Sequence, residues 1–346
     1  MGECQSSSGG AKVFGGGQIF IQLQENQISF VAGQVIQGFV HINMQQAFDA
    51  TNITVGLYGS EETYFRKRHR RGKSHYYRDH TGFQEILAHI FPIQQFVDGP
   101  PPVGQYTYPF ALQVPDWLPA SMMLGGEHEQ ARLAIKYSIR AQFTPRTADG
   151  WASAKLGISA FRGTRMIYIQ RPSMQFPKRD LKYSLKSEVG GFLGMGTSQC
   201  VSDIFFEKNE YYLGETANVR VICDNSACGK PIRSFKFKLH RHYKGHDDSH
   251  WTTTGSSYLI AHKEHGCPAG EKGDFTFKIV IPTQDTYQGD VVHKIHPDEI
   301  VMLKSFSTSV TGKLISVCYT LKCFVKHDAW NEFGEGNVVS LPIKIL

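Results

Sequence analysis

Residues 104–115 read Gly-Gln-Tyr-Thr-Tyr-Pro-Phe-Ala-Leu-Gln-Val-Pro, and they are followed by Leu-Pro-Ala-Ser at 118–121 and by Ile-Lys-Tyr-Ser-Ile-Arg-Ala at 135–141. The last of these runs alternates apolar and polar side chains, which is the pattern of a half-buried β-strand. Proline lacks the backbone N–H, so within a sheet it is tolerated mainly at an edge or in a turn. The stretch therefore predicts a strand, a proline-rich turn and a second strand.

The same alternation recurs in both halves of the chain. Apolar side chains occupy every second position in 19–23, in 235–239 and in 275–281. Turn residues such as those of 98–102 separate the runs at spacings typical of antiparallel sandwiches. The segment Phe83–Phe91 has helical spacing of its apolar residues but fits a strand equally well. The sequence predicts an all-β fold with at most one short helix.

Length and a break in the pattern predict two domains. At 346 residues the chain exceeds one ordinary domain of about 150 residues. Strand patterns end near Ile169, and the proline-containing, charged stretch 171–180 indicates a linker. We therefore expect two consecutive immunoglobulin-like β-sandwich domains, 18–170 and 181–346. The Ser/Gly-rich head, residues 1–17, is expected to be flexible.

Composition narrows the class of protein. Hydrophobic residues make up 41% and charged residues 20%, which excludes wholesale disorder. No apolar run approaches the ~20 residues of a membrane-spanning helix, and no secretory signal begins the chain, so we expect a cytoplasmic protein. The seven cysteines include no C-x-x-C pair and are interpreted as free thiols.

Signatures of enzymes are missing from the sequence. Neither G-x-S-x-G nor H-E-x-x-H occurs. Gly72-Lys73-Ser74 ends like a phosphate-binding loop, but Lys67 stands where that loop needs its first glycine. We therefore expect no catalytic residues and no cofactor.

Together, these motifs resemble the arrestin family, and more closely its α-arrestin branch, the arrestin domain-containing proteins. The segment 104–141 is similar to the amino-domain signature of a Pro-Phe strand, a Pro-x-x-Leu-Pro-x-Ser turn and a Tyr-x-Ile-x-Ala strand. Residues 33–40 resemble the early G-E-x-I-x-G-x-V strand pair, with Gln34 in the place of the usual acid, and 207–226 resemble the start of the carboxy domain. The resemblance covers 18–346.

The resemblance implies two curved sandwiches without a catalytic centre. Family members link membrane cargo or receptors to trafficking, ubiquitination or signalling machinery. We expect a non-enzymatic adaptor that binds membrane proteins or receptor tails at the cytosolic face of the plasma membrane or of endosomes. The alternative is a structural subunit of a coat or sorting complex, like the retromer's arrestin-fold component. No PPxY motif occurs in the sequence, so direct recruitment of a ubiquitin ligase through that motif is not expected.

The first six residues match the myristoylation pattern M-G-x-x-x-[ST]. Gly2 would carry the myristoyl group, and Cys4 offers a thiol for palmitoylation. Firm membrane attachment requires two such anchors, because one myristoyl chain binds only marginally. The alternative is an unmodified N-terminus.

A short basic stretch follows a predicted strand that ends near Tyr64. Its seven cations, with no acid between them, are Arg66, Lys67, Arg68, Arg70, Arg71, Lys73 and Arg78. They account for the net charge of +6, so we do not expect a broad basic face that binds nucleic acid. The stretch is interpreted as a long exposed loop. It either binds anionic lipid or phosphate groups, is simply solvated, or serves as a nuclear signal.

Histidines crowd one region of the second half: His240, His242, His246, His250, His262 and His265, with Cys267. Such residues bind zinc, but their spacing fits no known zinc motif, so we expect no metal site. His240 and His242 would share one sheet face, with the other histidines in a hairpin loop. The pairs Cys223/Cys228 and Cys318/Cys323 are interpreted as core residues.

Overall fold

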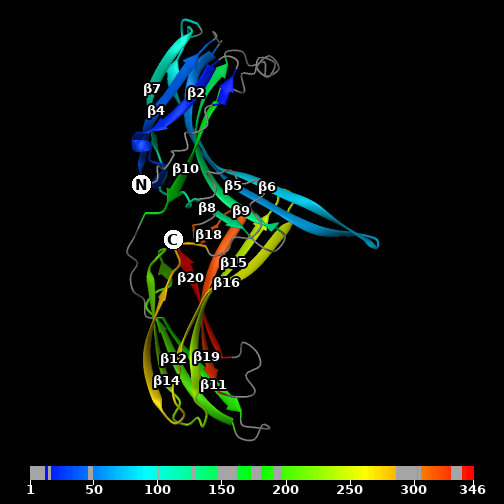
Figure 1. Ribbon diagram of the computed structural model, residues 1–346, viewed down its shortest axis with the longest axis vertical. Helices are drawn as coiled ribbons and strands as arrows, with labels where there is room; N and C mark the ends of the chain where they lie inside the picture. The colour runs from blue at the N-terminus through cyan, green and yellow to red at the C-terminus, as the bar shows by residue number, and fades with distance from the viewer. Residues whose placement is uncertain are drawn as a thin grey trace, which may run out of the picture. The chain divides into compact units, whose positions relative to one another are not determined.

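The computed structural model describes residues 12–14, 17–45, 50–99, 101–125, 130–145, 162–172, 181–190, 197–285, 302, 305–328 and 337–346. Strands dominate this part of the chain, and a short 3-10 turn, η1, lies at Gln24–Asn26. Figure 1 shows sheets joined by turns. The predicted all-β fold is confirmed. The helical alternative for 83–91 is wrong, because the whole segment lies within a strand.

The first half forms two sheets. The first has the order β1-β2-β4-β7, with bounds Lys12–Phe14, Gly17–Leu23, Val35–Met44 and Gly104–Gln113. The second has the order β3-β10-β9-β5-β6, with bounds Ser29–Val31, Arg162–Gln170, Arg132–Pro145, Ala50–Arg71 and Ser74–Gln95, and β8, Met122–Gly125, pairs with β9. Inward-facing side chains of both sheets, such as Ile19 and Ile135, are buried and form the core.

The second half also forms two sheets. One has the order β11-β12-β14-β17, with bounds Leu181–Gly190, Thr197–Phe206, Thr216–Asp224 and Lys272–Val280. The other has the order β13-β20-β19-β15-β16, with bounds Glu210–Tyr211, Val338–Ile345, Ile315–His327, Ile232–His246 and Thr252–His265, and β18, Val310–Thr311, pairs with β19. Phe235, Phe237 and Leu239 are fully buried, as the alternation of their strand predicts.

Among the described strands, the second half repeats the connectivity of the first. Each strand of the second half has the partners of the strand numbered ten lower, so the order β1-β2-β4-β7 becomes β11-β12-β14-β17. The pairs β3–β10 and β13–β20 are parallel, whereas pairs such as β2–β4 and β11–β12 are antiparallel. The two consecutive sandwiches expected from the sequence are thus two copies of one fold.

The proline-rich turn of the first half is fixed by hydrogen bonds within its own motif. The Tyr137 hydroxyl donates to the Pro119 carbonyl at 2.8 Å. The Ser121 N–H donates to the Ile169 carbonyl at 2.8 Å, and the Ser121 Oγ accepts from the Ile169 N–H at the same distance. These bonds fasten the turn to β9 and to β10. They give a physical reason for the tyrosine and the serine in the motif.

The described strands pack into two compact units. The first comprises Met1–Glu62, Gly82–Met122 and Ala134–Pro172, and the second Thr63–Thr81, Met123–Leu133 and Ser173–Leu346. The outer part of the β5–β6 hairpin, 63–81, therefore packs as part of the second unit. The predicted linker 171–180 lies outside the described residues except for Arg171 and Pro172. Of the head predicted as flexible, residues 1–17, Lys12–Phe14 instead form β1 and pair with β2, Gly17 is the first residue of β2, and residues 1–11, 15 and 16 lie outside the described part.

Candidate functional site

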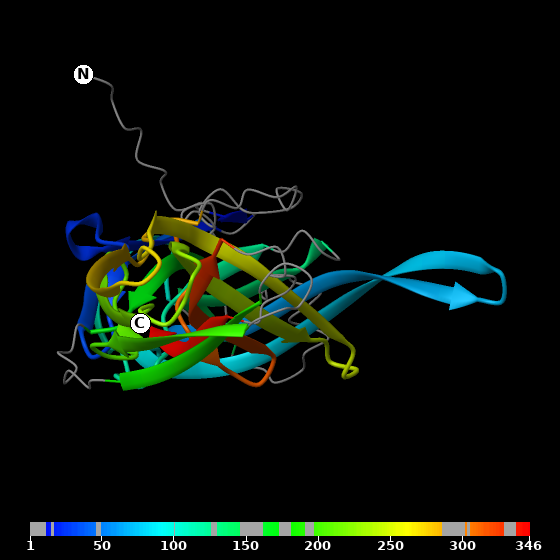
Figure 2. The same cartoon turned by 90° about the horizontal axis from the view of Figure 1, so that it is seen from below.

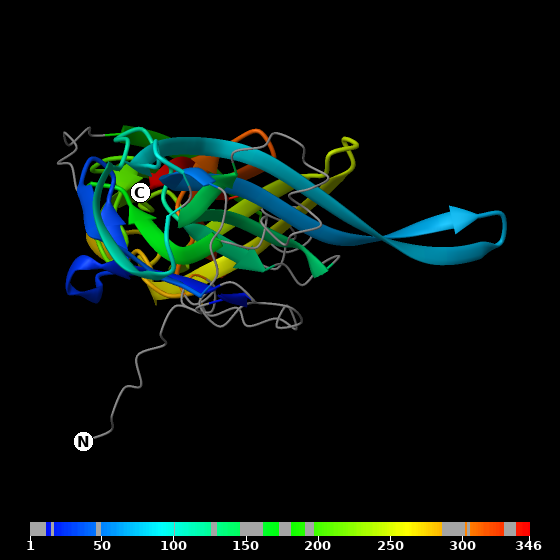
Figure 3. The ribbon, with the colours of Figure 1, turned by 90° about the horizontal axis from the view of Figure 1, so that it is seen from above.

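The basic stretch forms a β-hairpin, not the loop expected from the sequence. Strand β5 continues to Arg71, and β6 begins at Ser74 after a turn of two residues. Gly72 has a φ of +62°, a left-handed conformation that favours glycine in such a tight turn. Figures 2 and 3 show β5 and β6 as a long, twisted two-stranded ribbon.

The hairpin divides the seven predicted cations between two faces. A two-residue turn places Arg66 opposite Asp79 and His69 opposite Tyr76, and both pairs are in contact. Successive side chains of a strand point to opposite faces. The outer face carries Arg66, Arg68, Arg70, His75, Tyr77 and Asp79. The inner face carries Phe65, Lys67, His69, Arg71, Tyr76, Arg78 and His80. Lys73 lies in the turn.

The outer face combines cations with an exposed aromatic ring. Tyr77 is 61% exposed, and the Arg66 guanidinium lies 5.3 Å from the centroid of its ring. Asp79 lies 3.6 Å from Arg66 and offsets part of its charge. Arg68 and Arg70 are exposed on the same face. The Arg70 Nε–H donates to the Gly72 carbonyl at 2.8 Å. The outer face therefore presents three exposed arginines and a tyrosine, of which Arg66 and Arg70 each also have one partner within the hairpin.

The inner face packs an aromatic stack. The ring of His80 stacks on the ring of Phe65, with centroids 5.1 Å apart, and its Nε2 lies 3.0 Å from Nε2 of His69, with the two ring centroids 5.3 Å apart. Trp251, in the connection between β15 and β16, meets the His69 ring edge-on at 4.9 Å. His80 is only 3% exposed. The inner face is thus buried at Phe65 and His80 and half-buried at Lys67 and His69, whereas its residues nearer the turn are exposed.

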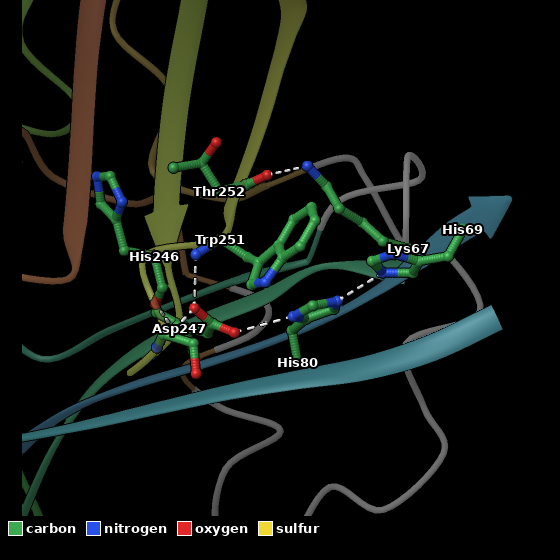
Figure 4. Close-up of polar contacts among 9 residues, drawn as sticks. Lys67, His69, His80, His246, Asp247, Trp251 and Thr252 are labelled. Atoms are coloured by element: carbon green, nitrogen blue, oxygen red, sulfur yellow. Dashed lines mark hydrogen bonds and ion pairs between the residues drawn. The ribbon is translucent and has the colours of Figure 1, made fainter. Parts of the chain in front are cut away.

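Asp247 joins this stack to the β15–β16 connection, as Figure 4 shows. Its Oδ2 lies 2.8 Å from His80 Nδ1, and its Oδ1 accepts from the N–H groups of Ser249, at 2.9 Å, and Trp251, at 2.7 Å. Burial alone would raise the pKa of Asp247, but the hydrogen bonds from His80, Trp251 and Ser249 outweigh burial and lower it. Asp247 is therefore ionised near neutral pH and fixes both the turn and the imidazole.

Lys67 makes a second contact between the hairpin and the same connection. Its ammonium group donates to the carbonyl oxygen of Thr252, the first residue of β16 (Figure 4). The Thr63 hydroxyl donates to the His246 carbonyl at 2.5 Å. Lys67 is thus engaged with a backbone carbonyl on the inner face and does not join the outer-face arginines.

Comparisons with known proteins decide the family. The model of the arrestin (or S-antigen) N-terminal domain matches residues 19–155, and the model of the arrestin C-terminal domain matches residues 199–346. The chain belongs to the arrestin family. It is also 24% identical over 245 residues to "Arrestin domain-containing protein A" of Dictyostelium discoideum, a match that covers 67% of this chain and 38% of that protein. The chain thus spans well under half of this curated relative.

The histidine region of this arrestin is arranged differently from the expectation. His246 ends β15, and His262 and His265 lie in β16, so of these residues only His250 lies in the connection between the strands. His240 and His242 do share a sheet face, with ring centroids 3.9 Å apart. In the described part of the chain, no three His, Cys, Asp or Glu side chains are grouped so as to hold a metal ion.

A second basic surface of the arrestin was missed by the sequence analysis. Lys238 of β15 is paired with Lys322 of β19, and Lys236 with Lys263 of β16, all on the outward face of one sheet. The Lys238 ammonium lies 4.1 Å from the centroid of Tyr258, which offsets part of the repulsion between like charges. The hairpin is therefore not the sole gathering of cations in the described residues.

Other predicted sites fall on different parts of the chain. Gly2 and Cys4, the predicted lipid attachment sites, lie outside the described residues. Cys223, Cys228 and Cys323 are buried free thiols as expected, but Cys318 is exposed, because it lies on the outward face of β19. In the part of the chain that the structure describes, no helix is long and apolar enough to cross a bilayer.

Proposed function

We propose that this arrestin is a non-enzymatic adaptor that binds cytosolic segments of membrane proteins or receptors in trafficking or signalling. The match of both arrestin domains along one chain supports this proposal. The protein would work at the cytosolic face of the plasma membrane or of endosomes, held there by a myristoyl group on Gly2 and a palmitoyl group on Cys4. Membrane proteins or receptor tails would be its partners.

The outer face of the hairpin is the part of the molecule that we assign to anionic groups, whether lipid headgroups or phosphates on cargo. Arg66, Arg68 and Arg70 lie along one side of a strand, about 7 Å apart from one to the next. An exposed Tyr77 ring beside them suits a membrane interface, where aromatic side chains with a polar end are favoured. The observation that supports this assignment is the exposure of these three arginines, which we call the row.

Vesicle flotation tests the assignment. Each cation near an anionic membrane contributes ~1 kcal/mol, so losing three weakens binding by roughly 100-fold. We expect the triple variant Arg66→Glu, Arg68→Glu, Arg70→Glu to lose binding to vesicles that contain phosphatidylserine. The matched control, Lys186→Glu, Lys230→Glu, Lys278→Glu, makes the same change in net charge at exposed lysines elsewhere and should bind as the wild type does.

A phosphopeptide titration of the same variants separates the two sources of anionic groups. Loss of vesicle binding with phosphopeptide binding intact assigns the row to lipid, and the reverse assigns it to phosphorylated cargo. Equal binding by the triple variant and the control in both assays overturns the assignment.

Proximity labelling in cells tests the adaptor role. We expect the wild type to label membrane proteins and their cytosolic tails, and Gly2→Ala to lose most of them. Intact-mass measurement of protein from eukaryotic cells checks for the two acyl groups directly. An unmodified N-terminus, together with unchanged labelling in Gly2→Ala, contradicts the anchor. Co-elution with fixed partners on size exclusion would favour a coat subunit instead.

A further inference from the structure

The turn of the hairpin brings together a serine and a pattern of arginines that the proposed function does not use. Ser74, the first residue of β6, ends the run Arg-Arg-Gly-Lys-Ser of residues 70–74. It is the single serine of the sequence with an arginine three positions before it. Kinases select substrates partly by such charge patterns, because acidic groups of the enzyme bind the arginine while the hydroxyl enters the active site. The pattern therefore indicates a substrate of a serine kinase that recognises basic residues.

The structure places this serine where a kinase can reach it. Every residue from Arg70 to Asp79 is exposed, so both faces of the ribbon meet solvent here. The turn lies at the end of the ribbon in Figures 2 and 3. A two-stranded ribbon with both faces exposed is only marginally stable, so its end opens at a low cost in free energy. Opening leaves residues 70–74 as an extended segment that a kinase cleft can bind.

Thr81 offers a comparison within the same hairpin, because Arg78 also precedes it by three positions. The Thr81 carbonyl accepts the Asp248 N–H at 3.3 Å, so this part of β6 is held to the β15–β16 connection and opens less readily than the turn. Asp79 also places an acid two positions before Thr81, and like charges oppose its entry into an acidic site. We expect Ser74 to be modified in preference to Thr81.

A phosphate on Ser74 would meet cations of the hairpin. The two-residue turn pairs Ser74 with Arg71 across the ribbon, and directly opposite side chains have Cβ atoms about 5 Å apart. Lys73 adjoins the serine in the turn, and Arg70 lies at the end of the row. A phosphoserine carries about −1.5 to −2 charges near neutral pH and accepts charge-assisted hydrogen bonds from arginine. It would therefore pair with Arg71 and offset roughly two of the positive charges of the stretch.

We propose that Ser74 is a phosphorylation site for a serine kinase that recognises basic residues, and that its phosphate weakens the binding of anionic groups by the row. The kinase transfers the γ-phosphoryl group of ATP. The bond between Ser74 Oγ and phosphorus forms, the bond from that phosphorus to the β,γ-bridging oxygen breaks, ADP leaves, and the hydroxyl proton passes to the base of the kinase. The site does not depend on the proposed function, whereas its effect on binding rests on the assignment of the row.

Phosphorylation of the purified full chain tests the site. A kinase that requires an arginine three positions before the serine is supplied with ATP, and intact mass and peptide mapping locate the phosphate. We expect a single phosphoryl group, on Ser74, and none in Ser74→Ala. Arg71→Gln should lower the initial rate by roughly tenfold or more, because it removes a charge-assisted hydrogen bond to the kinase. Arg78→Gln, the matched control, makes the same change in charge on the same face of the hairpin and should leave the rate at Ser74 unchanged.

A synthetic peptide of residues 68–77 reports on the pattern without the fold. We expect the kinase to phosphorylate both the peptide and the folded protein at Ser74. The site is overturned if either of them stays unmodified at this serine. Equal slowing by Arg71→Gln and Arg78→Gln overturns the role of the arginine pattern.

Flotation with phosphatidylserine vesicles and the phosphopeptide titration test the effect on binding. Because the phosphate offsets roughly two cations, the phosphorylated wild type should bind the anionic group of the row at least about tenfold more weakly than the unmodified protein. Ser74→Ala treated with the same kinase and ATP should bind as the unmodified wild type does. Equal binding by phosphorylated and unmodified wild type, where the triple arginine variant loses binding, overturns the effect. If the triple variant binds as its own control does, the assignment of the row fails and the effect with it, while the kinase assay still decides the site.

Discussion

Gln34 and Glu215 make the same hydrogen bond at equivalent places in the two halves of the chain. The Gln34 side-chain oxygen accepts from the Val31 N–H at 2.8 Å, and the Glu215 carboxylate accepts from the Tyr212 N–H at 2.9 Å. Each residue follows a glycine with positive φ, +93° at Gly33 and +80° at Gly214. The family pattern has an acid at this position. In the first half, the amide oxygen of Gln34 accepts the same hydrogen bond that a carboxylate oxygen accepts in the second half.

This equivalence predicts that Gln34→Glu is nearly neutral for stability. A glutamate keeps the acceptor for Val31, and the site is exposed, so the free energy of unfolding should change by less than about 0.5 kcal/mol. Glu215→Gln should cost up to about 1 kcal/mol, because Glu215 also forms an ion pair with Lys208. Urea denaturation measures both. A loss above 1 kcal/mol for Gln34→Glu would show that the two turns are not equivalent.

Any side chain at Gly214, the residue before Glu215, should destabilise the fold. Gly214 has a φ of +80°, and a Cβ there would lie 3.2 Å from Thr283. A left-handed conformation costs a residue with a Cβ ~1–2 kcal/mol, so Gly214→Ala should lower the free energy of unfolding by about that amount. Gly229→Ala is the matched control, because its Cβ would meet nothing within 4 Å and its φ is not positive. Equal effects of the two substitutions would exclude this explanation.

Two tyrosine hydroxyls occupy equivalent places in the two halves of the chain. Tyr137 donates to the Pro119 carbonyl, and Tyr319 donates to the Ser307 carbonyl at 2.6 Å. Both rings are buried, and burial raises the pKa of both phenols. Tyr137→Phe and Tyr319→Phe each leave a carbonyl without its hydroxyl partner, which should cost ~1–2 kcal/mol in denaturant unfolding. Tyr319→Phe should cost the more of the two, because it also removes a hydrogen bond with Arg241. Tyr77→Phe, at an exposed ring, should change stability by less than about 0.5 kcal/mol.

The sheets could be predicted from the sequence because burial on one face leaves a local pattern. Ile135, Tyr137 and Ile139 alternate with polar residues and are all buried. The hairpin could not be predicted this way. Beyond Phe65 both of its faces carry polar or charged side chains, so nothing in the hydropathy distinguishes the strand from a loop. In the segment after it, 83–91, the spacing of the apolar residues also allowed a helix with a buried apolar face. The segment is a strand, and its apolar residues Phe83 and Ile90 are 59% and 47% exposed.

The candidate site could be predicted only in part. The arginines of the hairpin are adjacent in sequence, so their charge is visible there, but their division between two faces depends on where the turn falls. The contact of His80 with Asp247 joins residues 167 positions apart, and no local pattern reports such a pair. The same holds for Lys238 and Lys322, which are brought together by strand pairing alone.

The pKa of Asp224, a surface carboxylate of the second sandwich, should depend on Lys272. Hydrogen bonds from Lys272 and from the Ser226 hydroxyl and N–H lower the pKa of Asp224 to about 2. A carboxyl with a depressed pKa in the folded state contributes stability above its unfolded value of ~3.9, and that contribution is lost as pH falls through the folded pKa. We expect Lys272→Ala to raise the pKa of Asp224 toward its ordinary value in a carbon-detected NMR titration. An unchanged titration would mean that Lys272 is not the main cause.

Thiol reactivity should separate the described cysteines by burial. Cys318 is exposed, whereas burial raises the pKa of Cys200 to about 11 and that of Cys223 to about 12. Only the thiolate reacts with iodoacetamide, so at pH 8 Cys318 should be alkylated at least about 100-fold faster than these two. Peptide mapping after timed quenching measures each rate, and the same reaction in urea should make the rates similar. Alkylation of Cys223 at the rate of Cys318 in native protein would contradict its place in the core of the second sandwich, between β12 and β17.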